Sequence, residues 1–204
     1  MFPLLGAALF GCLVYVAIAC CEKASPPKEH AGTLRAEGLR AVLCACAAIV
    51  GGLLFAHGAP PETLFAIAIL CAALGATCFL TTLETPVPLA VPAAPLAILV
   101  GAAALNHDFG PLISASVTGA PLALTALVLN RTRADFRDTC VAALGGAVFG
   151  MQLGMFAVGA ACLTIALARP YLARRRTRPQ PPPRFASALA GAFLMLLVGQ
   201  LAIS

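Results

Sequence analysis

The run TCVAALGGAVFGMQLGMFAVGAACLTIALA, from Thr139 to Ala168, decides how many helices this chain contains. It holds thirty residues and no charged side chain, whereas one membrane-spanning helix needs about 20 apolar residues. The run is therefore long for one helix and short for two. It contains several glycines, which permit close helix contacts. We interpret it as a helical hairpin that turns near Gly150–Gly154.

The rest of the chain is equally apolar. Of its 204 residues 61% are hydrophobic and only 10% are charged, whereas soluble domains carry about 25% charged residues. Six further apolar runs each match one span: Phe2–Cys21, Leu39–His57, Thr63–Thr81, Val87–Leu105, Pro111–Asn130 and Phe185–Ile203. These runs predict an all-α, polytopic protein of the cell inner (cytoplasmic) membrane, with a single transmembrane domain over residues 1–204.

The basic residues set the predicted topology. All 13 Lys and Arg residues fall within segments 23–40, 131–137 and 169–184, and short basic loops stay in the cytoplasm. A single helix over 139–168 would place the third segment outside, whereas a hairpin places all three inside. We therefore expect eight transmembrane helices with both termini external. The hairpin arms, of about fifteen residues each, would span the bilayer poorly at 1.5 Å per residue.

No motif indicates a cofactor or a metal. Most of the nine cysteines lie inside apolar runs, and none forms a CxxC pair, so we predict no metal site, no cofactor and no disulfide framework. The loop Arg169–Arg184 is rich in arginine and proline. It is interpreted first as a topology anchor, and its arginines are also suited to anionic lipid headgroups. No nucleic-acid partner is expected.

The eight acidic residues form two groups: those with a simple structural explanation and those that are candidates for a functional role. Five have simple explanations: Glu22, Glu29 and Glu37 as solvated partners of nearby basic residues, Glu62 as complement to a helix dipole, and Asp108 in an external turn. Glu84, Asp135 and Asp138 remain, all on the predicted cytoplasmic side. Neighbouring arginines can neutralise the two aspartates, and Asp138 is also well placed to cap the helix that begins at Thr139.

Four segments together resemble the type IV prepilin peptidases, intramembrane aspartic peptidases of the GxGD type. They are LGAALFGCLVYVAIAC (5–20), FLTTLETPVP (79–88), DTCVAALGGAVFG (138–150) and PPPRFASALAGAFLMLLVGQ (181–200). The resemblance covers nearly the whole chain and implies eight helices with a cytoplasmic-side active site. It also implies two aspartates, one acting as base on a water and one as acid.

The chain departs from the family pattern where the chemistry lies. Asp138 falls on the second catalytic aspartate, but Thr82 falls on the first. Glu84 matches a neighbouring acid two residues further on, which on a helix is about 200° of rotation away from Asp138. The segment DFRD replaces GxGD, and Cys140 replaces the usual lysine. The first loop has about seventeen residues and no zinc domain.

Three functions are therefore open. The leading hypothesis is a prepilin-peptidase-like protein without catalysis, a structural or accessory subunit that binds other membrane subunits or a pilin-like hydrophobic helix. The alternative is an active minimal leader peptidase that uses Asp138 with Glu84. A small transporter or channel is the third, although its candidate polar groups within the spans are few: Ser114, Ser116, Thr118, Thr125, Gln152 and Gln200.

Overall fold

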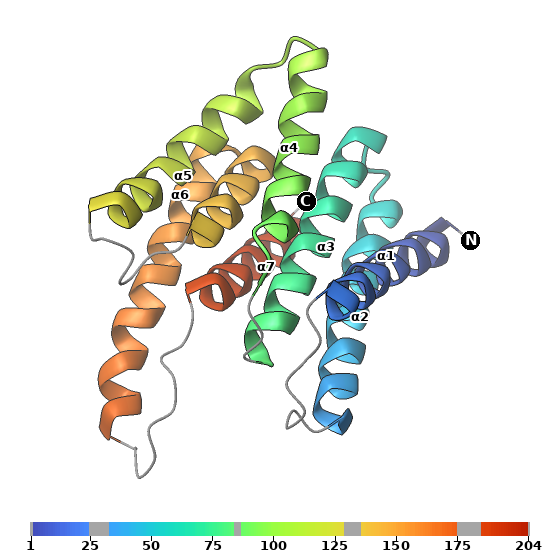
Figure 1. The fold of residues 1–204 in the computed structure, drawn as a ribbon. Coiled ribbons are helices and arrows are strands. Elements are labelled where there is room, and N and C mark those ends of the chain that lie inside the picture. Colours follow the sequence, from blue (N-terminus) through green and yellow to red (C-terminus); the bar gives the residue numbers. More distant parts are fainter. Residues whose placement is uncertain (1, 25–32, 84–86, 129–135, 175–184, 204) are drawn as a thin grey trace.

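The computed structural model describes residues 2–24, 33–83, 87–128, 136–174 and 185–203, which consist mainly of helices, with short described loops at 57–60 and 106–109. The helices are α1 (Phe2–Ala24), α2 (Thr33–Ala56), α3 (Pro61–Thr82), α4 (Ala90–Leu105), α5 (Gly110–Val128), α6 (Phe136–Arg174) and α7 (Phe185–Ile203). Within these ranges there is no strand. The predicted all-α class is confirmed (Figure 1).

Four helices are long and apolar enough to cross a membrane by length and composition: Pro3–Lys23, Ala36–Ala56, Pro61–Thr82 and Phe136–Leu167. Three shorter apolar helices accompany them: Ala90–Leu105, Gly110–Leu124 and Ala188–Leu197. This pattern supports a protein with several membrane-spanning helices. The choice of membrane, the number of eight spans and the sides of the termini remain predictions.

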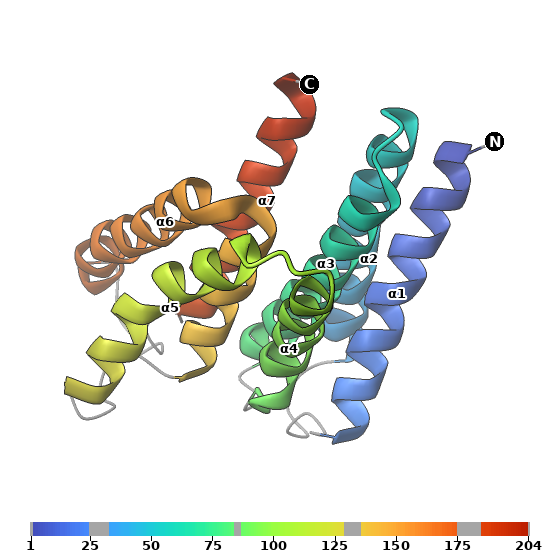
Figure 2. The same ribbon diagram turned by 90° about the horizontal axis from the view of Figure 1, so that it is seen from above.

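Helix α6 is broken at Gly150. This residue has φ 80° and ψ 172°, a combination that is essentially restricted to glycine. Figure 2 shows that α6 changes direction along its length. A Cβ added to Gly154 would lie 2.9 Å from the Cα of Gly146, although residues eight apart in a straight helix are separated by about 12 Å. A break in the helix is therefore present at Gly150, at one edge of the predicted range, and the separate membrane crossing of the two arms stays a prediction.

Two helices begin earlier than the apolar runs predict. Helix α2 starts at Thr33 rather than Leu39, so that Glu37 and Arg40 are helical. Helix α6 starts at Phe136, which places Asp138 in its first turn. The prediction that Asp138 caps the helix is therefore wrong. The physical reason is that charged side chains are compatible with a helical turn at a membrane boundary, where an acid in the first turn also complements the helix dipole.

Helix α3 contributes residues to two hydrophobic clusters. On one side Phe79 and Leu80 belong to the cluster that contains Val14 and Ile18 of α1. On the other side α3 contributes to a cluster with residues of α6 and α7, whose largest members include Leu70, Leu74, Val141, Leu144, Leu189 and Phe193. Phe193 also stacks on Phe149 of α6, with ring centroids 5.6 Å apart. Helix α3 therefore links α1 and α2 to α6 and α7.

Candidate functional site

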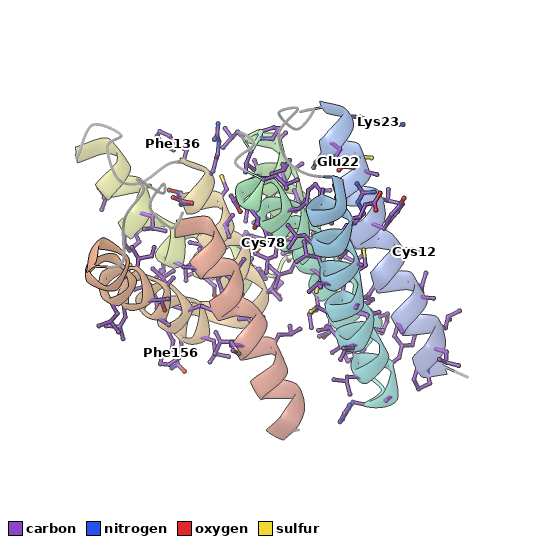
Figure 3. All side chains as sticks on the ribbon, turned by 90° about the horizontal axis from the view of Figure 1, so that it is seen from below. Cys12, Glu22, Lys23, Cys78, Phe136 and Phe156 are labelled. Atoms are coloured by element: carbon purple, nitrogen blue, oxygen red, sulfur yellow. The ribbon has the colours of Figure 1, made fainter. Side chains whose placement is uncertain are left out.

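The residues singled out by the resemblance lie at one end of the molecule. Figure 3 places Phe136, at the start of α6, at the same end as Glu22 and Lys23, at the end of α1. Arg40, near the start of α2, lies over the ring of Phe79 in the last turns of α3. We call this the basic end. It carries the last residues of α1 and α3 and the first residues of α2 and α6.

Thr82 is the last residue of α3 and is exposed. Its hydroxyl donates a hydrogen bond of 2.7 Å to the carbonyl oxygen of Cys78, one turn earlier in the same helix. This is the usual local bond of a threonine in an apolar helix. A neutral hydroxyl engaged in this way cannot act as the carboxylate base that the resembled family needs at this position.

Helical periodicity places Thr81, rather than Thr82, on the face of α3 that packs against α6 and α7. That face carries Leu70 and Leu74, and Thr81 follows Leu74 by seven residues, which is two turns. Thr81 is partly buried, and its hydroxyl bonds to the carbonyl oxygens of Thr77 at 2.8 Å and Cys78 at 3.0 Å. The residue at the end of α3 that turns toward α6 is therefore Thr81, which, like Thr82, has no carboxylate.

Glu84 lies outside the described residues. Helix α3 ends two residues before Glu84, because Thr82 is its last residue and Leu83 is its C-cap. The expectation that Glu84 faces away from Asp138 assumed that the helix continues past Thr82, and that assumption is wrong. Pro86 and Pro88 follow closely, and a residue before proline is disfavoured in the helical conformation.

Asp138 is partly buried in the first turn of α6, and Arg137 beside it is partly buried as well. Each takes part in interactions with neighbouring groups. Cys140, which replaces the family's lysine, is also partly buried and likewise engaged. Asp135 lies outside the described residues. Asp138, which the resemblance aligns with the second catalytic aspartate, is thus the candidate acid whose surroundings the structure describes.

Buried polar atoms without a hydrogen-bond partner, within the described part of the chain, are the hydroxyls of Thr77 and Thr139 and the Nε of Arg40. Thr77 is 1% exposed and precedes Thr81 by one turn. Thr139 follows Asp138 directly. Buried polar atoms are usually paired, and the two unpaired hydroxyls lie close in sequence to Thr82 and Asp138, whereas Arg40 belongs to α2.

An ion pair between Arg40 and Glu22 fastens α2 to α1 at the basic end. Glu22 therefore has a basic partner, as predicted, but the two side chains are only 22% and 23% exposed, so the pair is partly buried rather than solvated. The guanidinium also lies 5.5 Å from the ring centroid of Tyr15 and 5.7 Å from that of Phe79. Aromatic faces attract a cation, so this arginine of α2 contacts two other helices, α1 and α3. The available sequence signal was an acid at the end of one apolar run and an arginine at the start of the next.

Two hydroxyl groups of α5 form hydrogen bonds within their own helix. The hydroxyl of Ser116 bonds to the carbonyl oxygen of Leu112, and that of Thr118 bonds to the carbonyl oxygen of Ser114, both at 2.8 Å. Thr118 is fully buried, whereas Gln152, just past the break in α6, is exposed. Hydroxyls bonded within their own helix do not form a polar lining of the kind that a transporter path requires.

Within the described ranges, no group of three or more His, Cys, Asp or Glu residues is arranged to hold a metal ion. The nine cysteines all lie in the described ranges, and none of them forms a disulfide there. Comparisons with protein-family models, with curated proteins and with solved structures found no match to this chain. The resemblance to prepilin peptidases therefore rests on the four segments quoted above.

Proposed function

We propose that this chain is a prepilin-peptidase-like integral membrane protein that acts by binding, as a structural or accessory subunit of a membrane assembly. The observation that carries the proposal is Thr82. It takes the place of the first catalytic aspartate, and its hydroxyl is engaged with the Cys78 carbonyl. Thr81, the neighbour that turns toward α6, is a threonine too.

The expected partners are other membrane subunits or a pilin-like hydrophobic helix. Support comes from the apolar side chains that several helices expose. On the second arm of α6, Met151, Met155, Phe156, Leu163 and Leu167 are each at least 40% exposed. In a membrane such a face meets either lipid or another helix, and association there depends on close packing. Anionic lipid at Arg169–Arg184 remains a further proposed contact.

We also propose the finer topology of eight spans, with both termini external and the two arms of α6 crossing separately. The break at Gly150 supports it, because a chain that changes direction there need not continue through the membrane as one helix. Paired C-terminal fusions test it. Alkaline phosphatase should be active and green fluorescent protein dark, since phosphatase folds outside and the fluorescent protein inside. The opposite pattern would contradict an external C-terminus.

A second function, an active leader peptidase using Asp138 and Glu84, is favoured by one observation. Helix α3 ends at Thr82, so the expected rotation of about 200° between Thr82 and Glu84, which assumed a continuous helix, does not apply. The carboxylate would then have to share a proton with Asp138, as a dyad of acids does.

A cleavage assay separates the two functions. The purified full chain is incubated with a peptide that carries a basic leader, a glycine and a hydrophobic helix. For a binding subunit, the wild-type chain should cleave no faster than the Asp138→Ala variant. Cleavage by the wild type that is lost in both Asp138→Ala and Glu84→Gln, but kept in Glu37→Gln, would establish the peptidase and overturn the proposal.

A further inference from the structure

A cleft lies between the start of α3 and the end of the first arm of α6. It is lined by Glu62, Thr63, Ala66 and Ile67 of α3 and by residues 147–149 of α6, and it has a volume of about 270 Å³. One water occupies about 30 Å³, and ligand pockets begin near 300 Å³. The cleft therefore has room for a small organic molecule. Glu62 lies about 30 Å from Thr82 along α3, so this region is distinct from the basic end.

The cleft persists because its walls carry small or fixed side chains. Ala66 and Ala147 leave space between the two helices, and Gly150 breaks α6 directly after the lining residues. Phe149 is held by its stacking on Phe193, which belongs to the buried core. Ile67 is likewise 7% exposed and part of a core cluster. Two of the apolar walls are thus anchored in the core.

The described residues that line the cleft carry a negative charge and no positive one. Glu62 is the single charged group among the described residues that line it, and Thr63 adds a hydroxyl. The N-terminus of α3 contributes only about half a positive charge, which is smaller than the full negative charge of a carboxylate. The local field therefore favours a cation, while the walls of Ala, Ile, Val and Phe favour an apolar chain.

We infer that this cleft binds an ammonium group carried on a short alkyl chain, with the ammonium at Glu62 and the chain against Ile67, Val148 and Phe149. The Glu62 carboxylate, which is exposed at the edge of these apolar walls, forms charge-assisted hydrogen bonds with such a cation. Neither a neutral alcohol nor a carboxylate of the same length satisfies both features. This inference is independent of the proposed function, because the cleft and the Thr82–Asp138 region lie at opposite ends of α3.

The test is a calorimetric titration of the full chain in a non-ionic maltoside detergent, with heats from protein-free micelles subtracted. The probes are hexylammonium, hexanol and hexanoate. We expect saturable binding of hexylammonium at one site, and binding of the other two at least tenfold weaker. An absence of saturable binding, or equal binding of hexanol, would overturn the inference.

Two variants locate the site. Glu62→Gln removes the charge of an exposed side chain, and should weaken hexylammonium binding at least tenfold. Its control, Glu37→Gln, removes one exposed charge from α2 and should leave binding unchanged. Ala147→Leu should fill the cleft and abolish binding of the alkyl chain. Unchanged affinity in Glu62→Gln would show that the cation binds elsewhere and would overturn the assignment, whether or not Ala147→Leu folds.

Discussion

Two helix pairs in this molecule pack through glycines, but they use them differently. In the α1–α2 pair, Gly6 and Gly51 face each other, and a Cβ at Gly51 would lie 2.5 Å from the carbonyl oxygen of Gly6. In the α5–α6 pair, a Cβ at Gly146 would overlap the Thr118 hydroxyl and lie 2.8 Å from the carbonyl oxygen of Ser114. Both pairs thus bring backbones together where any side chain would intervene.

The difference lies in what accompanies the contact. The α1–α2 pair consists of two uninterrupted helices that are also fastened at the basic end by Arg40 and Glu22. In the α5–α6 pair a further glycine, Gly150, breaks one partner, so that both arms of α6 reach Thr118 through Gly146 and Gly154. In the first pair, glycines therefore allow close helix contact only. In the second pair, they allow close helix contact and a change in the direction of one helix.

The largest effect is expected for Gly146→Val, which removes the close approach in the second pair. The added side chain would meet backbone atoms of α5, which cannot move aside as a flexible side chain can. Overpacking of this kind costs about 3 kcal/mol of unfolding free energy, measurable by titration with a denaturing detergent. Gly159→Val in the same helix is the control, because a Cβ there meets nothing within 4 Å. Equal stability of the two variants would contradict the described contact.

Gly150→Ala tests the break itself, and we expect a loss of about 2 kcal/mol. A Cβ at Gly150 has open space around it, so the whole penalty would come from φ 80° and ψ 172°, a backbone region strained by about 1–3 kcal/mol for other residues. Gly159→Ala, at an open helical position, should be neutral or slightly stabilising. If Gly150→Ala instead stabilised the protein, α6 would be a continuous helix, and the second pair would resemble the first.

These glycines show what the sequence could and could not predict. Apolar run lengths predicted each helix, and the balance of basic loops predicted a turn in the run 139–168, which the backbone of Gly150 confirms. No residue pattern distinguished Gly150 from its neighbouring glycines. In the structure Gly146 and Gly154 contact Thr118 of α5, whereas a Cβ at Gly150 would meet nothing within 4 Å.

At the candidate site, the resemblance to prepilin peptidases singled out Thr82 and Asp138, but the sequence did not predict their surroundings. The helical start at Phe136 moved Asp138 from a cap into the first turn. The pairing of Glu22 with Arg40 joins residues 18 apart in the chain, and only the packing of α1 on α2 determines it. Rotation of α3 selects Thr81 as the residue facing α6, because Leu70 and Leu74 set the packed face.

Arg40→Met tests the ion pair between Arg40 and Glu22, which distinguishes the α1–α2 pair from the α5–α6 pair. Loss of the ion pair and of the contacts with two aromatic rings should cost about 1–2 kcal/mol, since Glu22 would remain partly buried without its partner. A double-mutant cycle with Glu22→Gln, read by the same denaturation, should give a coupling of about 1 kcal/mol. A coupling near zero would mean that the two charges are independent, and that glycine packing alone holds both pairs.

The smallest effect is expected for Thr82→Val, at the end of α3, the helix that links the two pairs. Its hydroxyl is exposed and bonds only one turn back in its own helix, so the change in unfolding free energy should stay within about 0.5 kcal/mol. Thr81→Val is the matched neighbour, on the partly buried face toward α6, and should cost more because that face is packed. If Thr82→Val proved the more damaging of the two, the hydroxyl would have a partner beyond α3. The first catalytic position would then retain a role, contrary to a subunit that acts by binding alone.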